Sequence, residues 1–353
     1  MSFKPDFDRL RAAVRLEEPD RVPLLEVLVN YSIQSAFLGR TVTHETINDQ
    51  IAFWSQAGYD YLPLTVGMMS PGKVTQDSAI SRVIQERIVS GEEEESWNLE
   101  KNSFIANRED FERFPWDALS EVDFKKFEQA GPLLPEKMKI VALSGKIFTL
   151  TWMILGFNSF ATNLILDEEL VADVFQKVGQ IQMNCVERIV NTPRVGAVWL
   201  VDDLAFGAGP MINPDMLRTY VFSWYKKIIQ RCHENGVLVF LHSDGDLSEL
   251  MDDIVDMGID LLHPIDPTCQ DIVAIKKQYG HKLAIAGNVS NELLRSGSPA
   301  EVEERVKYLI KNVAPGGGYF VCSGNSVAEW SRMENYMAMR AAAFRYGNYP
   351  IRL

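Results

Sequence analysis

Residues 237–267 read VLVFLHSDGDLSELMDDIVDMGIDLLHPIDP, and this stretch contains the repeating unit of the fold. It opens with an apolar, strand-forming run that breaks into His242, Ser243 and Asp244, continues as a helical pattern, and ends in a second apolar run from Asp260. A strand, a helix and a second strand form a βαβ unit, in which the two strands are parallel. The stretch therefore predicts a parallel sheet with ionisable groups at a strand end.

The same alternation continues through the whole chain of 353 residues. Strands that are apolar on both faces and alternate with helices favour a parallel sheet covered by helices. Eight such units predict a (β/α)8 TIM barrel, whereas no GxGxxG follows the first strand to favour the alternative, a doubly wound open sheet. The predicted strands are residues 22–28, 59–67, 139–145, 197–205, 237–245, 260–267, 283–289 and 318–324.

A single domain over residues 1–353, with a helical extension at its N-terminus, is expected from this pattern. The gap between the second and third predicted strands is long. Within it, residues 81–101 predict a β-hairpin insertion on the rim, and residues 111–131 predict additional helix.

Composition narrows the choice of partners. The net charge of −13 disfavours nucleic acid and membrane surfaces, because an acidic protein repels phosphate groups. The first residues lack the apolar core of a signal peptide, and no apolar run approaches the roughly 20 residues of a membrane helix, so a cytoplasmic protein is expected. The four cysteines form no CxxC, and in a reduced compartment a special cysteine is a ligand or a nucleophile rather than half of a disulfide.

Chemistry in a TIM barrel is concentrated at the C-terminal ends of the strands. Those ends are rich in ionisable and amide side chains here, whereas the opposite ends of the predicted strands look bland. The residues at the C-terminal ends are Glu26 and Asn30, Asp202 and Asp203, His242, Asp244 and Asp246, His263 and Asp266, Asn288, and Cys322, Ser323 and Asn325.

A metal centre is the sharpest interpretation of this set. His242 and Asp244 are two positions apart on a strand, so their side chains leave the same face. With Cys322 from the last strand they would supply three zinc ligands and leave an open position, as in a catalytic zinc site. Each residue also has a plainer interpretation: a packed histidine, a buried apolar cysteine, and a turn with a helix N-cap.

Large apolar side chains near the strand ends could form a substrate wall, although simple core packing would also explain them. They would suit a flat, largely apolar substrate. These residues are Met68, Met69, Phe148, Trp152, Met153, Phe157 and Phe206.

Four motifs resemble the uroporphyrinogen decarboxylase superfamily in order and spacing: RLEEPDRVPLLEV from Arg15, DDLAFG from Asp202, FLHSDGD from Phe240 and AIAGNVS from Ala284. The resemblance spans almost the whole chain and implies the barrel. The decarboxylases of this superfamily carry an arginine-rich motif after the first strand that binds the acidic groups of the porphyrinogen. This chain has EVLVNYSIQSAFLGR at that place, so no arginine pair is available and true uroporphyrinogen decarboxylase activity is not expected.

The methyltransferase branch of the superfamily implies a different chemistry, in which a methyl group moves to or from a corrinoid protein. That branch binds Zn²⁺ through His-x-Cys and a second cysteine on the last strand. His242 and Cys322 match two of these positions, Asp244 stands where a cysteine is expected, and Asp266 matches an acidic fourth ligand. A carboxylate in place of a thiolate should make zinc a stronger Lewis acid, which favours a methoxylated substrate over a thiol.

Three hypotheses follow. The first is a zinc-dependent, corrinoid-linked methyltransferase of the O-demethylase type, with Asp202 or Asp203 as the catalytic acid. The second is a metal-independent decarboxylase or lyase that uses the same two carboxylates, and the third is a non-catalytic relative. The small substrate would contact Glu26, Asn30, Met68, Phe148, Trp152, Phe206, His263 and Asn288. Homodimer formation is left open.

Overall fold

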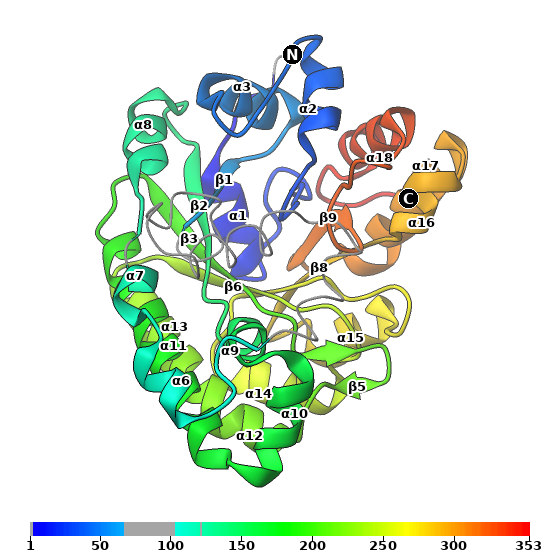
Figure 1. The fold of residues 1–353 in the computed structure, drawn as a ribbon. Helices are drawn as coiled ribbons and strands as arrows, with labels where there is room; N and C mark the ends of the chain where they lie inside the picture. Colours follow the sequence, from blue (N-terminus) through cyan, green and yellow to red (C-terminus); the bar gives the residue numbers. More distant parts are fainter. Residues whose placement is uncertain (1–2, 67–102, 121) are drawn as a thin grey trace.

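A curled, parallel seven-stranded sheet forms the centre of the molecule, with helices packed around its outside (Figure 1). The computed structural model describes residues 3–66, 103–120 and 122–353, and every structural statement refers to these residues. The strand order is β1-β2-β3-β6-β7-β8-β9, so neighbours in the sheet follow the order of the chain. The strands are β1 (Tyr61–Thr65), β2 (Lys139–Ser144), β3 (Val195–Val201), β6 (Leu238–His242), β7 (Leu261–His263), β8 (Ala284–Val289) and β9 (Tyr319–Ser323).

The parallel α/β sheet is confirmed for seven of the eight predicted strands. The first predicted strand is not formed: residues 22–29 make only isolated bridges, Leu24 to Val321 and Val29 to Val327. The Tyr61 side chain explains why residues 22–29 form no strand pairing with β1. The Tyr61 hydroxyl accepts from the backbone N–H of Glu26 at 2.8 Å and donates to the Glu26 carbonyl at 2.6 Å, so both backbone groups are used without a ladder. A closed eight-stranded barrel is therefore not confirmed, and the predicted rim hairpin at 81–101 lies outside the described residues.

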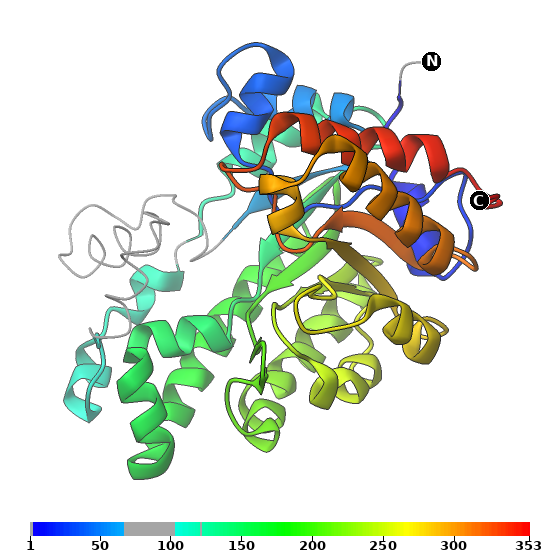
Figure 2. The ribbon, with the colours of Figure 1, turned by 90° about the vertical axis from the view of Figure 1, so that its right-hand side faces the viewer.

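The helices begin and end at recognisable signals. In α17, Ser298 and Glu301 form a reciprocal capping box and a proline occupies the first turn. Helix α17 packs against β8 and β9, and Figure 2 shows α18 lying alongside α17. The helices are α1 (Phe7–Val14), α2 (Tyr31–Leu38), α3 (Ile47–Ala57), α6 (Arg108–Arg113), α7 (Trp116–Ser120), α8 (Lys125–Leu133), α9 (Phe148–Leu155), α10 (Phe157–Leu166), α11 (Glu168–Val190), α12 (Pro214–Leu217), α13 (Ser223–Glu234), α14 (Met251–Asp256), α15 (Ile272–Tyr279), α16 (Asn291–Ser296), α17 (Pro299–Val313) and α18 (Met333–Tyr346).

Three shorter elements complete the description. A π-helical turn, η2 (Arg218–Phe222), joins α12 to α13, and a 3-10 turn, η3 (Ser248–Leu250), precedes α14. A small antiparallel hairpin, β4 (Ala205–Phe206) with β5 (Gly209–Pro210), follows β3. Among the described residues no single helix is long and apolar enough to cross a membrane. The bent pair α9 and α10, broken by 95°, passes that test together by length and composition only.

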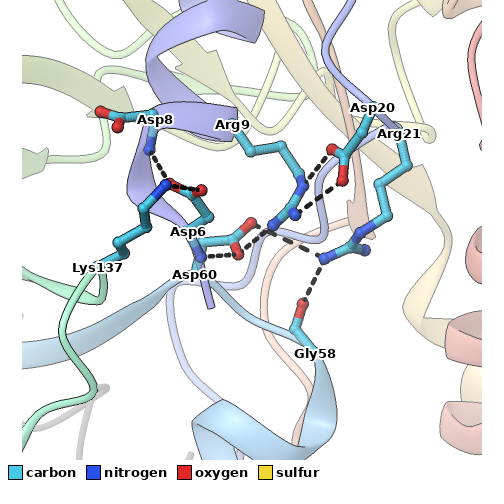
Figure 3. A network of polar contacts seen from close by, with 8 residues as sticks. All are labelled: Asp6, Asp8, Arg9, Asp20, Arg21, Gly58, Asp60 and Lys137. Carbon is cyan, nitrogen blue, oxygen red and sulfur yellow. Dashed lines mark hydrogen bonds and ion pairs between the residues drawn. The ribbon is translucent and has the colours of Figure 1, made fainter. Parts of the chain in front are cut away.

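The N-terminal ends of the strands hold an ionic network, built around one buried carboxylate, that the sequence analysis missed (Figure 3). Asp60, which directly precedes β1, is fully buried; it accepts from the Asp6 backbone N–H at 2.8 Å and from the Arg9 guanidinium. Arg9 also binds Asp20 through two nitrogens, at 2.6 and 2.9 Å, and a guanidinium nitrogen of Arg21 lies 3.9 Å from Asp60. The network fixes α1 to this end of the sheet, opposite the C-terminal ends of the strands.

Candidate metal centre at the C-terminal ends of the strands

Asp203, His242 and Asp244 converge where β3 and β6 end. The register pairs Val201 with His242, so Asp203, two residues beyond Val201, leaves the same face of the sheet as the imidazole. The Asp203 Oδ1 atom lies 3.6 Å from His242 Nε2 and accepts the Asp244 backbone N–H at 3.3 Å. One ligand atom from each of the three residues lies within 4.8 Å of the others.

A glycine allows the loop after β6 to pass close to the β4–β5 hairpin. Gly245 has φ of +88°, and a Cβ atom there would lie 2.6 Å from the carbonyl oxygens of Ala205 and Phe206. Any other residue would be strained by the positive φ and would collide with backbone. The SDGD sequence therefore sets the path on which Asp244 reaches the cluster.

The charges of the cluster are poorly compensated by the protein itself. Burial, together with the nearby carboxylates of Asp203 and Asp266, raises the pKa of Asp244 to about 6, although His242 and Asn325 act in the opposite direction. The Oδ2 atom of Asp244 accepts from the Asn325 amide, but its Oδ1 atom is buried without a hydrogen-bond partner among the described residues. A bound cation would give that oxygen a partner.

The donor set fits zinc. Two carboxylates and one imidazole are accepted ligand types, and three protein ligands leave the fourth position of a tetrahedral site for a substrate. The Asp203 side chain is 46% exposed, so the cluster is reachable from solvent, whereas His242 is only 5% exposed and is held in place by its surroundings.

His263 lies beside the cluster on β7. Its Nδ1 atom lies 2.9 Å from the Nδ1 atom of His242, and its ring packs edge-to-face on Trp199 with centroids 5.0 Å apart. Burial lowers the pKa of His263 well below its ordinary value, with a smaller effect in the same direction from His242, so the ring is neutral at neutral pH.

Asp202, one of the two predicted catalytic residues, is directed away from the cluster and towards the start of α9. Its oxygens accept from the backbone N–H groups of Ile147, Phe148 and Thr149 at 2.7–2.8 Å and from the Tyr225 hydroxyl at 2.8 Å. Burial raises the pKa of Asp202, while the donor groups around it act to lower it. One oxygen of Asp202 accepts three of these hydrogen bonds and the other accepts one, so this buried carboxylate anchors the start of α9.

Two predicted ligands lie outside the convergent group, namely Cys322 and Asp266. Cys322 is fully buried on β9, and burial, with a contribution from Glu26, raises the pKa of its thiol well above the ordinary value. Asp266 accepts from the backbone N–H and hydroxyl of Thr268 with one oxygen, and from the Gly245 N–H at 3.2 Å with the other. Asp266 thus supports the loop that carries Asp244.

Three predicted substrate contacts bind the protein itself. Glu26 accepts from the Ser323 backbone N–H at 2.8 Å and its hydroxyl at 2.6 Å. Asn30 caps α2 by accepting the Ser32 N–H at 2.8 Å, and the Asn288 side chain accepts from Arg305 at 2.8 Å.

The predicted aromatic wall divides into core and surface. Phe148 is fully buried, whereas Phe206 is 54% exposed. Between them, Trp152 contacts Phe157 at 5.7 Å between ring centroids, and Phe157 contacts Phe206 at 6.5 Å. The series Trp152, Phe157 and Phe206, here called the aromatic edge, therefore extends from the protein to the surface. Met68 and Met69 lie outside the described residues.

Two contributors to this region received no role from the sequence. Asn325 was noted only as a residue at a strand end, and its bond to Asp244 depends on two distant loops meeting. Tyr225 lies within an amphipathic helical pattern, where a buried tyrosine gives no signal of the hydroxyl contact that it makes with Asp202.

The fold and the cluster define an α/β protein with a curled parallel sheet and a candidate metal centre at the C-terminal ends of its strands. The Uroporphyrinogen decarboxylase (URO-D) family profile matches residues 116–346, well over half of the chain. The chain belongs to this family.

Two solved structures are similar to this chain to different degrees. A methyltransferase from Methanosarcina mazei superposes with a TM-score of 0.68 at 16% identity, over 96% of this chain and 98% of that one. A sugar phosphate isomerase/epimerase from Parabacteroides distasonis gives a TM-score of 0.29 at 11% identity, over 70% and 93% of the two chains. No curated protein matches the sequence.

Proposed function

We propose that this protein is a zinc-dependent methyltransferase of the uroporphyrinogen decarboxylase superfamily. It would transfer a methyl group from a small methoxylated substrate to a corrinoid carried by a partner protein. The observation that carries the proposal is the convergence of Asp203, His242 and Asp244, with ligand atoms within 4.8 Å of one another. The fold is also similar to that of a methyltransferase, which supports the proposal. The sequence identity is 16%, a level at which the similarity concerns the fold alone.

Asp203, His242 and Asp244 would hold the metal, with Asp203 as a ligand rather than as the separate acid that the sequence suggested. Cys322 and Asp266 lie outside the cluster in this structure, and they stay predicted ligands only for a conformation that brings them closer to it. When bound, zinc would supply Lewis acidity towards the ether oxygen of the donor. A site made of hard carboxylates suits that oxygen better than a thiol.

The chain's own residues would bind and orient the donor. The aromatic edge offers ring faces to a flat substrate, and the exposed side of Asp203 leaves an approach to the cluster. Residues 26–40 contain a single arginine, Arg40, whose guanidinium binds Asp49 at 2.7 Å. A porphyrinogen with several carboxylates would find no arginine pair in this segment, which weighs against the decarboxylase alternative.

The test measures zinc content and methyl transfer together. Purified protein would be analysed for bound zinc and supplied with a methoxylated benzoate and free cobalamin in the Co(I) state, whose methylation is followed by absorbance. His242→Ala and Asp244→Asn should lose zinc and turnover together, because two ligands cannot complete the shell. His233→Ala is the matched control, since His233 lies on α13 and binds Asp260.

Two further assays separate the alternatives. Asp244→Cys recreates the His-x-Cys pattern and should shift the preference from oxygen to thiol groups, because a thiolate makes zinc softer. Uroporphyrinogen is the second substrate to be offered. Full zinc and full activity in His242→Ala, or formation of coproporphyrinogen by zinc-free protein, would overturn the proposal.

A further inference from the structure

The carboxylate of Asp203 has few contacts of its own among the described residues. The side chain is 46% exposed, and its Oδ1 atom accepts the Asp244 N–H at 3.3 Å and lies 3.6 Å from His242 Nε2. A metal ligand has to be held within about 0.5 Å of its productive position, and contacts of this length do not hold a side chain so closely. The backbone that carries the carboxylate must therefore supply the precision.

Two buried hydroxyl groups hold that backbone. Beyond β3, which ends at Val201, two successive N–H groups donate to side chains in place of a neighbouring strand. The Asp203 N–H donates to the Thr149 hydroxyl at 3.2 Å. The Leu204 N–H donates to the Ser243 hydroxyl at 2.9 Å. Thr149 is 4% exposed and Ser243 is fully buried, so water competes little for either bond.

We propose that Thr149 and Ser243 are positioning residues, which fix the backbone of Asp203 and thereby direct its carboxylate at the cluster. The two N–H groups belong to the two planar peptide units that flank the Asp203 Cα atom, so holding both units holds φ and ψ and with them the direction of the side chain. The pair Thr149 and Ser243 is here called the hydroxyl clamp. The clamp belongs to the metal-free protein, while its effect on zinc binding rests on the proposed function.

The hydroxyl clamp also links the cluster to the aromatic edge. Thr149 lies in the first turn of α9, and its backbone N–H donates to Asp202 at 2.7 Å, which ties the start of the helix to the end of β3. Trp152, the inner member of the aromatic edge, follows three residues later on the same helix. One helix therefore carries both a support of Asp203 and part of the proposed substrate wall, so the spacing between them is set by α9.

Two substitutions at Thr149 separate the hydroxyl from the shape of the side chain. Thr149→Val keeps the branched shape but cannot accept the Asp203 N–H, whereas Thr149→Ser keeps an acceptor. Zinc affinity, measured by competition with a chelating indicator, should fall by roughly 10–100-fold in Thr149→Val, the range for loss of a ligand's supporting partner. It should stay close to that of the wild-type protein in Thr149→Ser. Ser243→Ala removes the second acceptor and should weaken zinc binding in the same way.

Tyr225→Phe is the matched control for Thr149→Val. Burial raises the pKa of Asp202 and the Thr149 hydroxyl acts against it, so Thr149→Val also takes a polar group away from Asp202. Tyr225→Phe removes the hydroxyl that donates to Asp202 at 2.8 Å and leaves both bonds of the clamp in place. Both variants should be less stable in urea, but only Thr149→Val should lose zinc affinity.

Amide hydrogen exchange in the metal-free, ¹⁵N-labelled protein observes the hydroxyl clamp directly. The N–H groups of Asp203 and Leu204 should be protected in the wild-type protein. Exchange at Asp203 should become about tenfold faster in Thr149→Val, the equivalent of one typical hydrogen bond, and return towards the wild-type rate in Thr149→Ser. If Thr149→Val fails to fold, Ser243→Ala gives the same test at Leu204.

The outcomes distinguish this inference from the proposed function. If exchange at Asp203 responds as expected but the wild-type protein binds no zinc, the proposed function fails and the hydroxyl clamp stands. Rapid exchange of the Asp203 N–H in the folded wild-type protein would overturn the inference. Equal losses of zinc affinity in Thr149→Val and Tyr225→Phe would overturn it as well, because Thr149 would then act only through the stability of the fold.

Discussion

The side chains of Asp202 and Asp203 leave consecutive residues in opposite directions. Asp202 accepts three backbone N–H groups at the start of α9 and the Tyr225 hydroxyl, whereas Asp203 lies 3.6 Å from His242 Nε2. Successive side chains of an extended chain alternate between faces, so a pair of adjacent acids can serve two sides of one sheet. One carboxylate holds a helix and the other belongs to the candidate metal centre.

Alanine substitutions at the two positions should therefore affect different properties, namely stability at Asp202 and zinc binding at Asp203. Asp202→Ala leaves several buried donors without an acceptor, at about 1–3 kcal/mol for each group, and should lower the free energy of unfolding by roughly 3–5 kcal/mol. Asp203→Ala should change it by less than about 1 kcal/mol but weaken zinc binding. Urea unfolding of metal-free protein and zinc titration measure the two effects. The assignment of roles is wrong if Asp203→Ala proves the less stable variant.

Asn325 should matter for the metal and little for stability. Its amide donates to Asp244 Oδ2, and removing a residue that orients a ligand typically weakens metal binding by about 10–100-fold. Asn325→Ala should show a loss of zinc affinity in this range, with a thermal midpoint close to that of the wild-type protein. Ser326→Ala, at the next residue of the same loop, is the control and should bind zinc normally. Unchanged affinity in Asn325→Ala would remove Asn325 from the site.

Glu26 should make stability depend on pH. Complete burial raises its pKa from 4.5 to about 8, against the effect of two hydrogen bonds from Ser323. Between these values the folded protein retains a proton that the unfolded chain has lost, so this group's contribution to stability is fully present below pH 4.5 and disappears as the pH rises towards 8.

Glu26→Gln tests that sign, because glutamine stays neutral and can keep both contacts with Ser323. The stability of the variant relative to wild type should rise between pH 5 and pH 8, by up to about 1.4 kcal/mol per pH unit. Urea unfolding midpoints of both proteins at each pH give the difference, in which the titration of all other groups cancels. A constant difference over this range would mean that Glu26 is already ionised in the folded protein at pH 5.

The ionic network at the other end of the sheet should contribute to the stability of the fold and have no effect on the candidate metal centre. Asp60→Asn leaves Arg9 and Arg21 near each other without their buried counter-ion, which typically costs about 3–5 kcal/mol. Asp20→Asn removes a carboxylate whose side chain is 64% exposed and should cost less than about 1 kcal/mol. Chemical unfolding compares the two, and both variants should retain wild-type zinc affinity when folded. Similar stabilities for the two would contradict the assigned importance of Asp60.

Local patterns were sufficient for most of the sheet. Apolar runs separated by amphipathic segments predicted seven strands at the places where they occur. The run at 22–28 has the same pattern, but the Tyr61 hydroxyl binds both backbone groups of Glu26. That contact joins residues 35 positions apart, and no local pattern contains it.

The sequence predicted that a candidate metal centre lies at the strand ends, but it predicted only some of the residues that converge there. The alternation of strands and helices places His242 and Asp244 at a strand end, but the choice of partners depends on which strands are neighbours. Strand β3 pairs with β6, which brings Asp203 to the imidazole. Cys322, on β9, lies outside the convergent group, although Asn325, three residues further along the chain, reaches Asp244. Sheet order and register are long-range properties that residue spacing does not encode.

The contact between Asn325 and Asp244 ties the candidate metal centre to the order of protein synthesis. Asp244 emerges from the ribosome with β6, but the residue that orients its carboxylate follows β9, about eighty residues later. A nascent chain that has released only the first six strands of the sheet carries the acidic and imidazole groups without the bond that aligns them. Under the proposed function, tight zinc binding would therefore require the completed chain.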